Sequence, residues 1–191
     1  MNLLALPYPT SDLVAQAVLR FDSDARYGSA DRVLSRIFSQ CPTNTALEDV
    51  LLKVVLLNSL YNTNVFAVMD MALHIRHLHI DADLAIASTE LVDRIARLSI
   101  SGKVRRHYSF ATKYCSWHRP ADYPIYDNFV EKILLLYQRK YKFAEFSKPD
   151  LREYSRYKET LNAFRIYFGF EFISFKELDR FLWWTSKDLG L

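Results

Sequence analysis

Glycine, proline and cysteine are scarce in this sequence of 191 residues, which contains four, six and two of them. Folds made of many short strands need turn residues at regular intervals, so the shortage of glycine and proline favours long helices over an all-β architecture. Cys41 and Cys115 show no CxxC or Cys/His spacing. We therefore expect reduced thiols in a cytoplasmic protein, without a disulfide framework or an iron–sulfur cluster.

Long apolar runs and a strong charge imbalance are also missing. No stretch approaches the roughly 18–20 apolar residues that a membrane-spanning helix needs. The starting segment MNLLALPYPTSD lacks the basic region of a signal peptide. The net charge is only +3, with a pI near 8.8. The composition thus predicts no membrane segment, and it permits a nucleic-acid-binding surface without requiring one.

Helical periodicity and aromatic residues are abundant. Half of the residues are hydrophobic, with thirteen Phe and twelve Tyr among them, and the apolar spacing predicts roughly eight to ten helices with little or no sheet. The segment ALEDVLLKVVLLNSLY is apolar around most of its surface, which predicts a central buried helix. LVDRIARLSI and VRRHYSFATKYCSWH are predicted to be two further helices, joined by a short turn at Gly102. We predict an all-α fold in a single helical domain of residues 1–191.

The most informative stretch runs from Gly102 to Asp127. Three cationic residues, Lys103, Arg105 and Arg106, follow the glycine and predict a small basic face suited to phosphate groups. A predicted helix comes next, then a loop with two prolines, and then the aspartate.

Two segments of this sequence resemble a known family. HYSFATKYCSWHRPADYPIYD is similar to the part of helix-hairpin-helix DNA glycosylases that contains a helix, a proline-bearing loop and the catalytic aspartate, and the 8-oxoguanine branch has a similar two-proline loop. LLNSLYNTNV resembles the family's buried helix that ends in polar residues at the lesion-side groove. Together the two segments cover about residues 45–140, and the helices of residues 150–191 are expected to pack back on this core.

The resemblance implies a two-lobed helical bundle of the helix-hairpin-helix glycosylase type. It also implies a monomeric enzyme that removes a modified base from duplex DNA by base flipping and needs no cofactor. RNA in place of DNA remains open, and so do a repair role and an anti-phage role. One departure concerns the hairpin, because the family has two glycines there and this sequence has Gly102 alone.

The resemblance further implies that Asp127 is the catalytic carboxylate. Cleavage of an N-glycosidic bond develops positive charge on the sugar, which a nearby carboxylate stabilises. The local sequence predicts a second role, because an Asp directly before FVEKILLLY is a typical helix N-cap. The two roles are compatible.

The amine that bifunctional glycosylases use as a nucleophile is displaced in this sequence. The resemblance puts it at His107 to Ser109, where no lysine stands, and a serine there is similar to the adenine-removing branch, in which the aspartate works with water alone. Lys113 follows Ser109 by one helical turn and therefore faces the same side. We predict that Lys113 is the substituting catalytic amine. The alternative is a solvated lysine or a phosphate contact.

Other polar and aromatic residues of the two segments are predicted to contact the nucleic acid. An extruded base leaves a gap that a side chain fills, and aromatic rings stack on bases. The alternatives are a polar turn that ends a helix and ordinary core packing. The predicted DNA contacts are Tyr61, Asn62, Asn64, His107 and Ser109, together with the basic face, and the predicted base pocket contains Trp117 and His118.

A metal site is not predicted. The spacing of His74, His77 and His79 brings only the first pair to one helical face, and no cysteine or carboxylate pair accompanies them. Two rival interpretations remain beside the enzyme. One is a non-catalytic module that binds nucleic acid or protein, and the other is a plain helical interaction domain.

Overall fold

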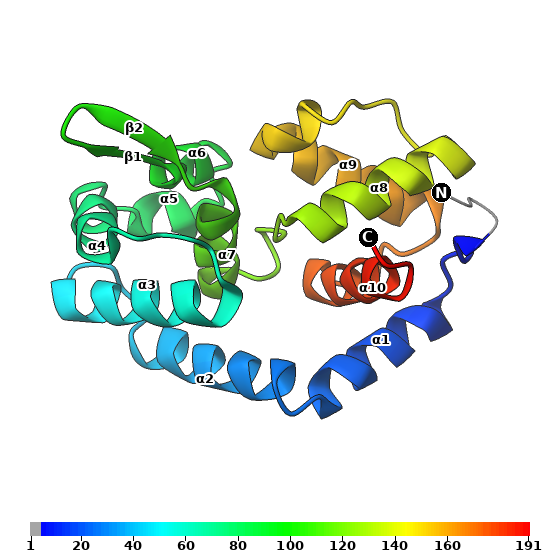
Figure 1. The fold of residues 1–191 in the computed structure, drawn as a ribbon, viewed down its shortest axis with the longest axis horizontal. Coiled ribbons are helices and arrows are strands. Elements are labelled where there is room, and N and C mark those ends of the chain that lie inside the picture. Colours follow the sequence, from blue (N-terminus) through cyan, green and yellow to red (C-terminus); the bar gives the residue numbers. More distant parts are fainter. Residues whose placement is uncertain (1–4) are drawn as a thin grey trace. The chain divides into compact units, whose positions relative to one another are not determined.

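The computed structural model describes residues 5–191 (Figure 1). Residues 1–4, which begin the segment expected to lack a signal peptide, lie outside this range. The helices are α1 Ser11–Ser23, α2 Tyr27–Gln40, α3 Leu47–Tyr61, α4 Val68–His77, α5 Asp81–Ala85, α6 Glu90–Ala96, α7 Tyr108–His118, α8 Asn128–Tyr141, α9 Tyr154–Tyr167 and α10 Phe175–Asp188. The strands are β1 Arg97–Ile100 and β2 Lys103–Arg106, and a short 3-10 helix, Asp150–Arg152, precedes α9.

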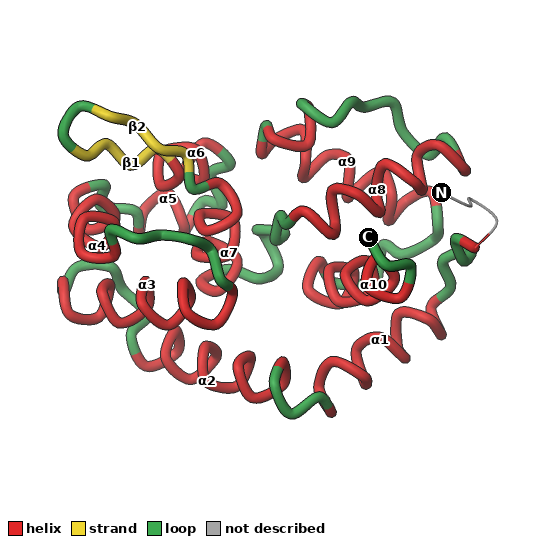
Figure 2. Tube along the Cα trace, viewed as in Figure 1, coloured by secondary structure: helices red, strands yellow, loops and turns green. Residues whose placement is uncertain are grey.

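Helices dominate the described part of the chain, as Figure 2 shows in red, and the prediction of a mainly helical protein is confirmed. The finer prediction, a bundle of the glycosylase type, stays a prediction. Within residues 5–191, no helix combines the length and the apolar character that a membrane crossing requires.

The chain forms two compact units. Unit 1 comprises Met1–Ala25 and Pro124–Leu191, and unit 2 comprises Arg26–Tyr123. Unit 1 contains α1 and α8–α10, and unit 2 contains α2–α7 with both strands. The predicted single domain thus consists of two units, and the predicted core of residues 45–140 crosses the boundary between them.

The hairpin of β1 and β2 corrects two predicted helices. The helix predicted for LVDRIARLSI ends at Ala96, and the one predicted for VRRHYSFATKYCSWH begins only at Tyr108. The strands between them pair antiparallel (Figure 2). Ser101 and Gly102 connect them with φ values of 49° and 76°. Two left-handed residues in a two-residue loop match the twist of paired strands, so this turn chemistry overrides the helical spacing of the flanking residues.

Unit 2 is organised around α3, which packs against α2, α4 and α7. Its buried face contains Val50, Lys53, Val54 and Leu57. This is the one-sided stripe of an amphipathic helix, because Val55 on another face is exposed. The predicted central helix is therefore central but buried on one side only.

Unit 1 has an aromatic core. Tyr137 of α8 and Phe164 of α9 meet edge to face at 5.2 Å between ring centroids, and Phe168 lies 4.5 Å from Phe164. α10 packs on α1 and α8. It begins with a capping box in which Ser174 and Glu177 satisfy each other's backbone N–H groups.

Candidate functional site

Lys113 lies on α7 with only 3% of its surface exposed. Its Nζ donates a hydrogen bond to Ser109 Oγ at 2.7 Å, and it lies 5.3 Å from the centre of the Tyr61 ring. The predicted alignment of Ser109 and Lys113 on one side of the helix is therefore confirmed, and the alternative of a solvated lysine is wrong. The catalytic role of Lys113 stays a prediction.

The turn between α3 and α4 is ordered by the side chain of Asn58. Its Nδ2 donates to the Val65 carbonyl at 3.1 Å, and its Oδ1 accepts from the Val65 amide at 2.9 Å. Asn62 and Asn64 are exposed and have φ values of 50° and 57°, which Asn tolerates better than most residues. The helix-ending turn is thus present, and the predicted gap-filling role of these residues remains a prediction. Sequence reasoning missed Phe66, which is 82% exposed beside this turn.

The basic residues after Gly102 lie on β2 and are exposed. Arg106 forms an ion pair with Asp93 at 2.7 Å, and its guanidinium lies 4.3 Å from the centre of the Tyr108 ring. Lys103 and Arg105 alternate with Val104, so they share the other face of the strand. Lys103 and Arg105 are therefore exposed cations of the hairpin, and their role in phosphate binding remains a prediction.

His107 links the hairpin to α7. Its amide donates to the Ala96 carbonyl at 2.8 Å. Burial, and to a lesser extent the charge of Arg105, lowers the pKa of the imidazole below its ordinary value of 6.5. A contact of His107 with DNA would therefore use a neutral ring at neutral pH.

Trp117 and His118 both pack against Phe38 of α2. The ring centroids lie 6.0 Å and 4.9 Å from that of Phe38. Burial and the nearby Lys53 ammonium lower the pKa of His118 to about 3, so its ring is neutral across the physiological range. The packing agrees with the core alternative for Trp117, and the base-pocket role of both residues stays a prediction.

A polar cluster inside unit 2 was missed by the sequence reasoning. The fully buried Lys53 of α3 donates to the carbonyl oxygens of Cys41 at 3.0 Å and Thr43 at 2.8 Å, and to Asn44 Oδ1 at 2.8 Å. Tyr114 donates to the same Asn44 oxygen at 2.6 Å. The sequence does contain a signal for the burial of Lys53, because it occupies the apolar stripe of positions 50, 53, 54 and 57, which faces the core.

Asn44 joins this cluster to α5. Its Nδ2 donates to Asp81 Oδ1 at 2.6 Å, and its backbone N–H donates to Asp81 Oδ2 at 3.0 Å. On the other side of the ammonium, His118 Nε2 lies 3.4 Å from Lys53 Nζ. The cluster therefore connects α3, the 41–46 loop, α5 and α7.

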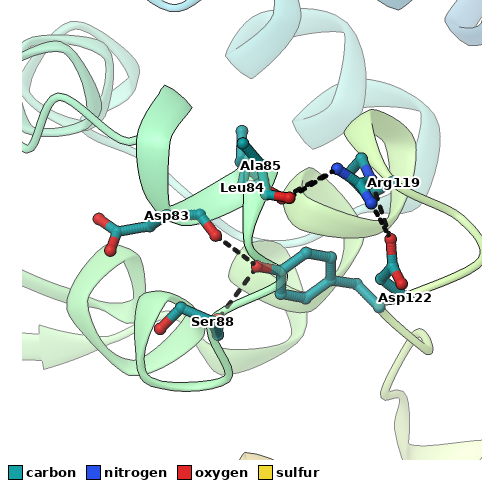
Figure 3. Close-up of polar contacts among 7 residues, drawn as sticks. Asp83, Leu84, Ala85, Ser88, Arg119 and Asp122 are labelled. Atoms are coloured by element: carbon teal, nitrogen blue, oxygen red, sulfur yellow. Dashed lines mark hydrogen bonds and ion pairs between the residues drawn. The ribbon is translucent and has the colours of Figure 1, made fainter.

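The first part of the proline loop is bonded to the region around α5, as Figure 3 shows. Arg119 forms an ion pair with Asp122 at 2.6 Å and donates to the Ala85 carbonyl at 3.1 Å. The Tyr123 hydroxyl donates to the Ser88 carbonyl at 3.0 Å. These contacts define how the chain leaves α7 within unit 2.

Asp127 belongs to unit 1, where it caps α8. Its Oδ1 accepts from the Val130 amide at 2.8 Å. The N-cap prediction is confirmed, and the catalytic role remains a prediction. One turn later lies the buried carboxylate of Glu131, which the sequence reasoning missed; it pairs with Lys148 at 2.8 Å and Arg152 at 3.3 Å.

His74, His77 and His79, the three histidines considered as metal ligands, do not form a common metal-binding group. His74 Nε2 lies 2.9 Å from the Arg94 carbonyl oxygen. Among residues 5–191, no group of three or more His, Cys, Asp or Glu side chains is arranged to hold a metal ion.

Comparison with known proteins relates this structure to a family. Residues 13–122 match HI_0787_N, a family described as an N-terminal domain, so the matched range includes Lys113 and ends before Asp127. The chain is also similar to an uncharacterized protein of Haemophilus influenzae, with 39% identity over 147 residues that cover 76% of this chain and 70% of that protein. No solved structure matches the chain. Because more than half of its residues match, the chain belongs to the HI_0787_N family.

Proposed function

We propose that this protein is a DNA N-glycosylase in which the Lys113 amine is the reacting group. The observation that carries this proposal is the setting of that amine. It is almost fully buried, 2.7 Å from a hydroxyl and beside an aromatic ring, on the helix that directly follows an exposed basic hairpin. A nucleophilic amine needs a defined position, which packing and a hydrogen bond supply.

The reaction replaces one bond to the sugar by another. The neutral amine attacks C1′, the N-glycosidic bond breaks, and the departing base takes the bonding electron pair and a proton. The C1′–O4′ bond of the sugar then breaks, the ring oxygen takes that electron pair and the amine's remaining proton, and a double bond forms between the amine nitrogen and C1′ to give an imine. Water hydrolyses this imine and regenerates the amine. Ser109 Oγ accepts from the amine in the resting protein and so orients it.

Two surfaces of unit 2 support a nucleic-acid substrate. Lys103 and Arg105 are exposed on the hairpin, where they suit phosphate groups. The ordered Asn62–Asn64 turn directly follows Tyr61, whose ring contacts the Lys113 amine. A base extruded toward the amine would therefore pass residues suited to fill the gap that it leaves.

A second candidate function is a binding module that holds nucleic acid without a reaction. The short β-hairpin favours this candidate, because it occupies the place where the resemblance implies a glycine-rich turn between helices. Both functions use the same cations, and they differ in whether Lys113 forms a bond.

Borohydride trapping separates the two functions. The full chain is incubated with duplexes that contain 8-oxoguanine, an alkylated purine or an abasic site, and borohydride reduces any imine to a stable amine. We expect a covalent protein–DNA product for the wild type and for Lys132→Met, an exposed control in α8. The product should be absent for Lys113→Met, which keeps the apolar stem without the amine.

The other outcomes are equally informative. Base release without trapping that disappears in Asp127→Asn would identify a monofunctional enzyme that depends on the carboxylate and contradict the role of Lys113. Binding without either reaction would identify the module, and a failure to bind any of these duplexes would exclude both candidates.

A further inference from the structure

The cluster around Lys53 places a positive charge inside unit 2 and connects it to α7. An ammonium has three protons, and Lys53 donates them to the three oxygens of Cys41, Thr43 and Asn44. These acceptors are neutral. The Asp81 carboxylate accepts a hydrogen bond from Asn44, so the Asn44 side chain stands between this carboxylate and the Lys53 ammonium.

The cluster contacts one side of α7. Tyr114 and His118 are one helical turn apart, and both point toward Asn44 and Lys53. Phe38 packs against the same two rings at 5.6 Å and 4.9 Å. Ser109 and Lys113 form another pair one turn apart, on a face rotated by about 140° from the first. Any rotation of α7 that loosens the first pair therefore moves the second.

Stability alone does not account for a buried ammonium at this position. Burial lowers the pKa of Lys53 to about 8, although Asp81 and other acidic groups nearby oppose this shift. The charged form therefore destabilises the fold at neutral pH relative to the neutral form. Buried ion pairs or triads that are replaced as a whole by apolar residues of similar volume often leave proteins equally or more stable. What the ammonium does supply is a set of directional hydrogen bonds that, through Asn44, links the 41–46 loop, α5 and α7.

We propose that Lys53 is the positioning residue of unit 2, and that its ammonium sets the orientation of α7 through Asn44, Tyr114 and His118. The 41–46 loop and α5 are the fixed partners in this link, and α7 is the helix that the link orients. The consequence for the Lys113 amine rests on the proposed function, whereas the orientation of α7 does not.

Other titratable groups face the ammonium from each surrounding element. Asp49 lies one turn before Lys53 on α3, and the remaining groups come from the loop, α5 and α7. The groups that influence or contact the ammonium are Cys41, Asp49, Asp81, Tyr114 and His118. His118 is already neutral at neutral pH, so its titration does not alter these contacts. As pH rises through about 8, the pKa of Lys53, the ammonium loses a proton and the hydrogen bonds to its neighbours change.

Hydrogen exchange tests the orientation of α7 without any reference to catalysis. Lys53→Met removes the ammonium and keeps the stem. Tyr114→Phe removes only the hydroxyl that joins α7 to Asn44, whose oxygen still accepts from Lys53. We expect faster amide exchange, about tenfold or more, in peptides covering residues 41–46 and 108–118 in both variants, because Tyr114→Phe loses one hydrogen bond and Lys53→Met loses three. Lys132→Met and Tyr8→Phe, both at exposed side chains, are the matched controls and should exchange as the wild type does.

Thermal unfolding and trapping complete the test. We expect Lys53→Met to unfold at the same temperature as the wild type or a higher one, while its trapping rate falls about tenfold or more through misplacement of the amine. After division by the base-catalysed intrinsic rate at each pH, the protection of wild-type α7 amides at pH 9.5 should approach that of Lys53→Met at pH 7.

Two results would overturn the proposal. The first is unchanged α7 exchange in both Lys53→Met and Tyr114→Phe. The second is a loss of thermal stability in Lys53→Met with exchange raised equally throughout unit 2, which would indicate a merely structural role. If the wild type traps no DNA but the variants change α7 exchange as expected, the proposed glycosylase function fails and the positioning role stands.

Discussion

Glu131 of unit 1 and Lys53 of unit 2 are two buried charges with opposite surroundings. Glu131 lies between the cations of Lys148 and Arg152 and accepts a hydrogen bond from Tyr126. Lys53 is bonded to neutral oxygens. Burial raises the pKa of Glu131, but hydrogen bonds from Lys148 and Tyr126 and the charge of Arg152 outweigh it, so the pKa is lowered and the charged form is favoured. Burial lowers the pKa of Lys53 to about 8, so its charged form is disfavoured.

This difference distinguishes a charge that stabilises a unit from a charge that orients one. Glu131 holds the segment after α8 by ionic contacts that persist at neutral pH. The charged form of Lys53 is disfavoured by burial at neutral pH, and its hydrogen bonds connect α3, the 41–46 loop and α5 to α7. Substitution of each charged residue tests this comparison separately. Substitution of an apolar core residue gives a reference for the size of the effects on the free energy of unfolding.

The largest effect is expected for Phe164→Ala in the aromatic core of unit 1. The ring is fully buried against Tyr137, Phe143 and Phe168, and its removal leaves a cavity. We expect a loss of about 3–5 kcal/mol in the free energy of unfolding, measured by urea denaturation. Phe172→Ala is the matched control, because that ring is exposed, and its effect should stay within about 0.5 kcal/mol.

The pH dependence of Lys53 comes next. Its pKa in the folded chain is about 8, below the ordinary value of 10.5, so the unfolded chain binds more protons between these two values. Stability of the wild type should therefore rise with pH across that window, relative to Lys53→Met, by on the order of 3 kcal/mol. Urea denaturation of both proteins at pH 7 and pH 10 measures this difference. A constant difference between the two proteins would contradict the buried charge.

Glu131→Gln should show the same sign with pH in an acidic window, because the pKa of Glu131, like that of Lys53, is lower in the folded chain than in the unfolded one. The lowered pKa means that the carboxylate contributes stability above its ordinary value of 4.5, and that this contribution disappears as pH falls through the folded-state pKa. We expect a loss of about 1–3 kcal/mol at pH 7, and convergence of wild type and variant as pH falls below the folded-state pKa of Glu131. Both cations are half exposed, so added salt should reduce the difference. A difference that grows in acid would exclude an ionised Glu131.

The smallest effect on stability separates the two roles of Asp127. Asp127→Ala removes the cap of α8 and should lower stability by about 1 kcal/mol. Asp127→Asn retains a good N-cap, so we expect a change of only a few tenths of a kcal/mol. If base release falls in Asp127→Asn while stability is unchanged, the carboxylate charge matters for the reaction; equal activity would leave Asp127 as a cap only.

Local patterns predicted several parts of this structure correctly. The alignment of Ser109 and Lys113 on α7 follows from helical geometry, and the cap at Asp127 follows from the preference of Asp for that position. The hairpin was missed because the helical spacing of the residues beside Ser101-Gly102 was weighted above the turn chemistry.

By itself, then, the sequence determined what depends on neighbours along the chain: the helical class, the cap at the start of α8 and the polar turn after Tyr61. Only the tertiary structure decided which polar groups are buried together. The Lys53 cluster joins Asn44 to Tyr114 across 70 positions, and the burial of Lys113 depends on how α3 and α7 pack. The physical reason is that burial and hydrogen bonding act through space, so the environment of a charge is set by segments that are distant in the sequence.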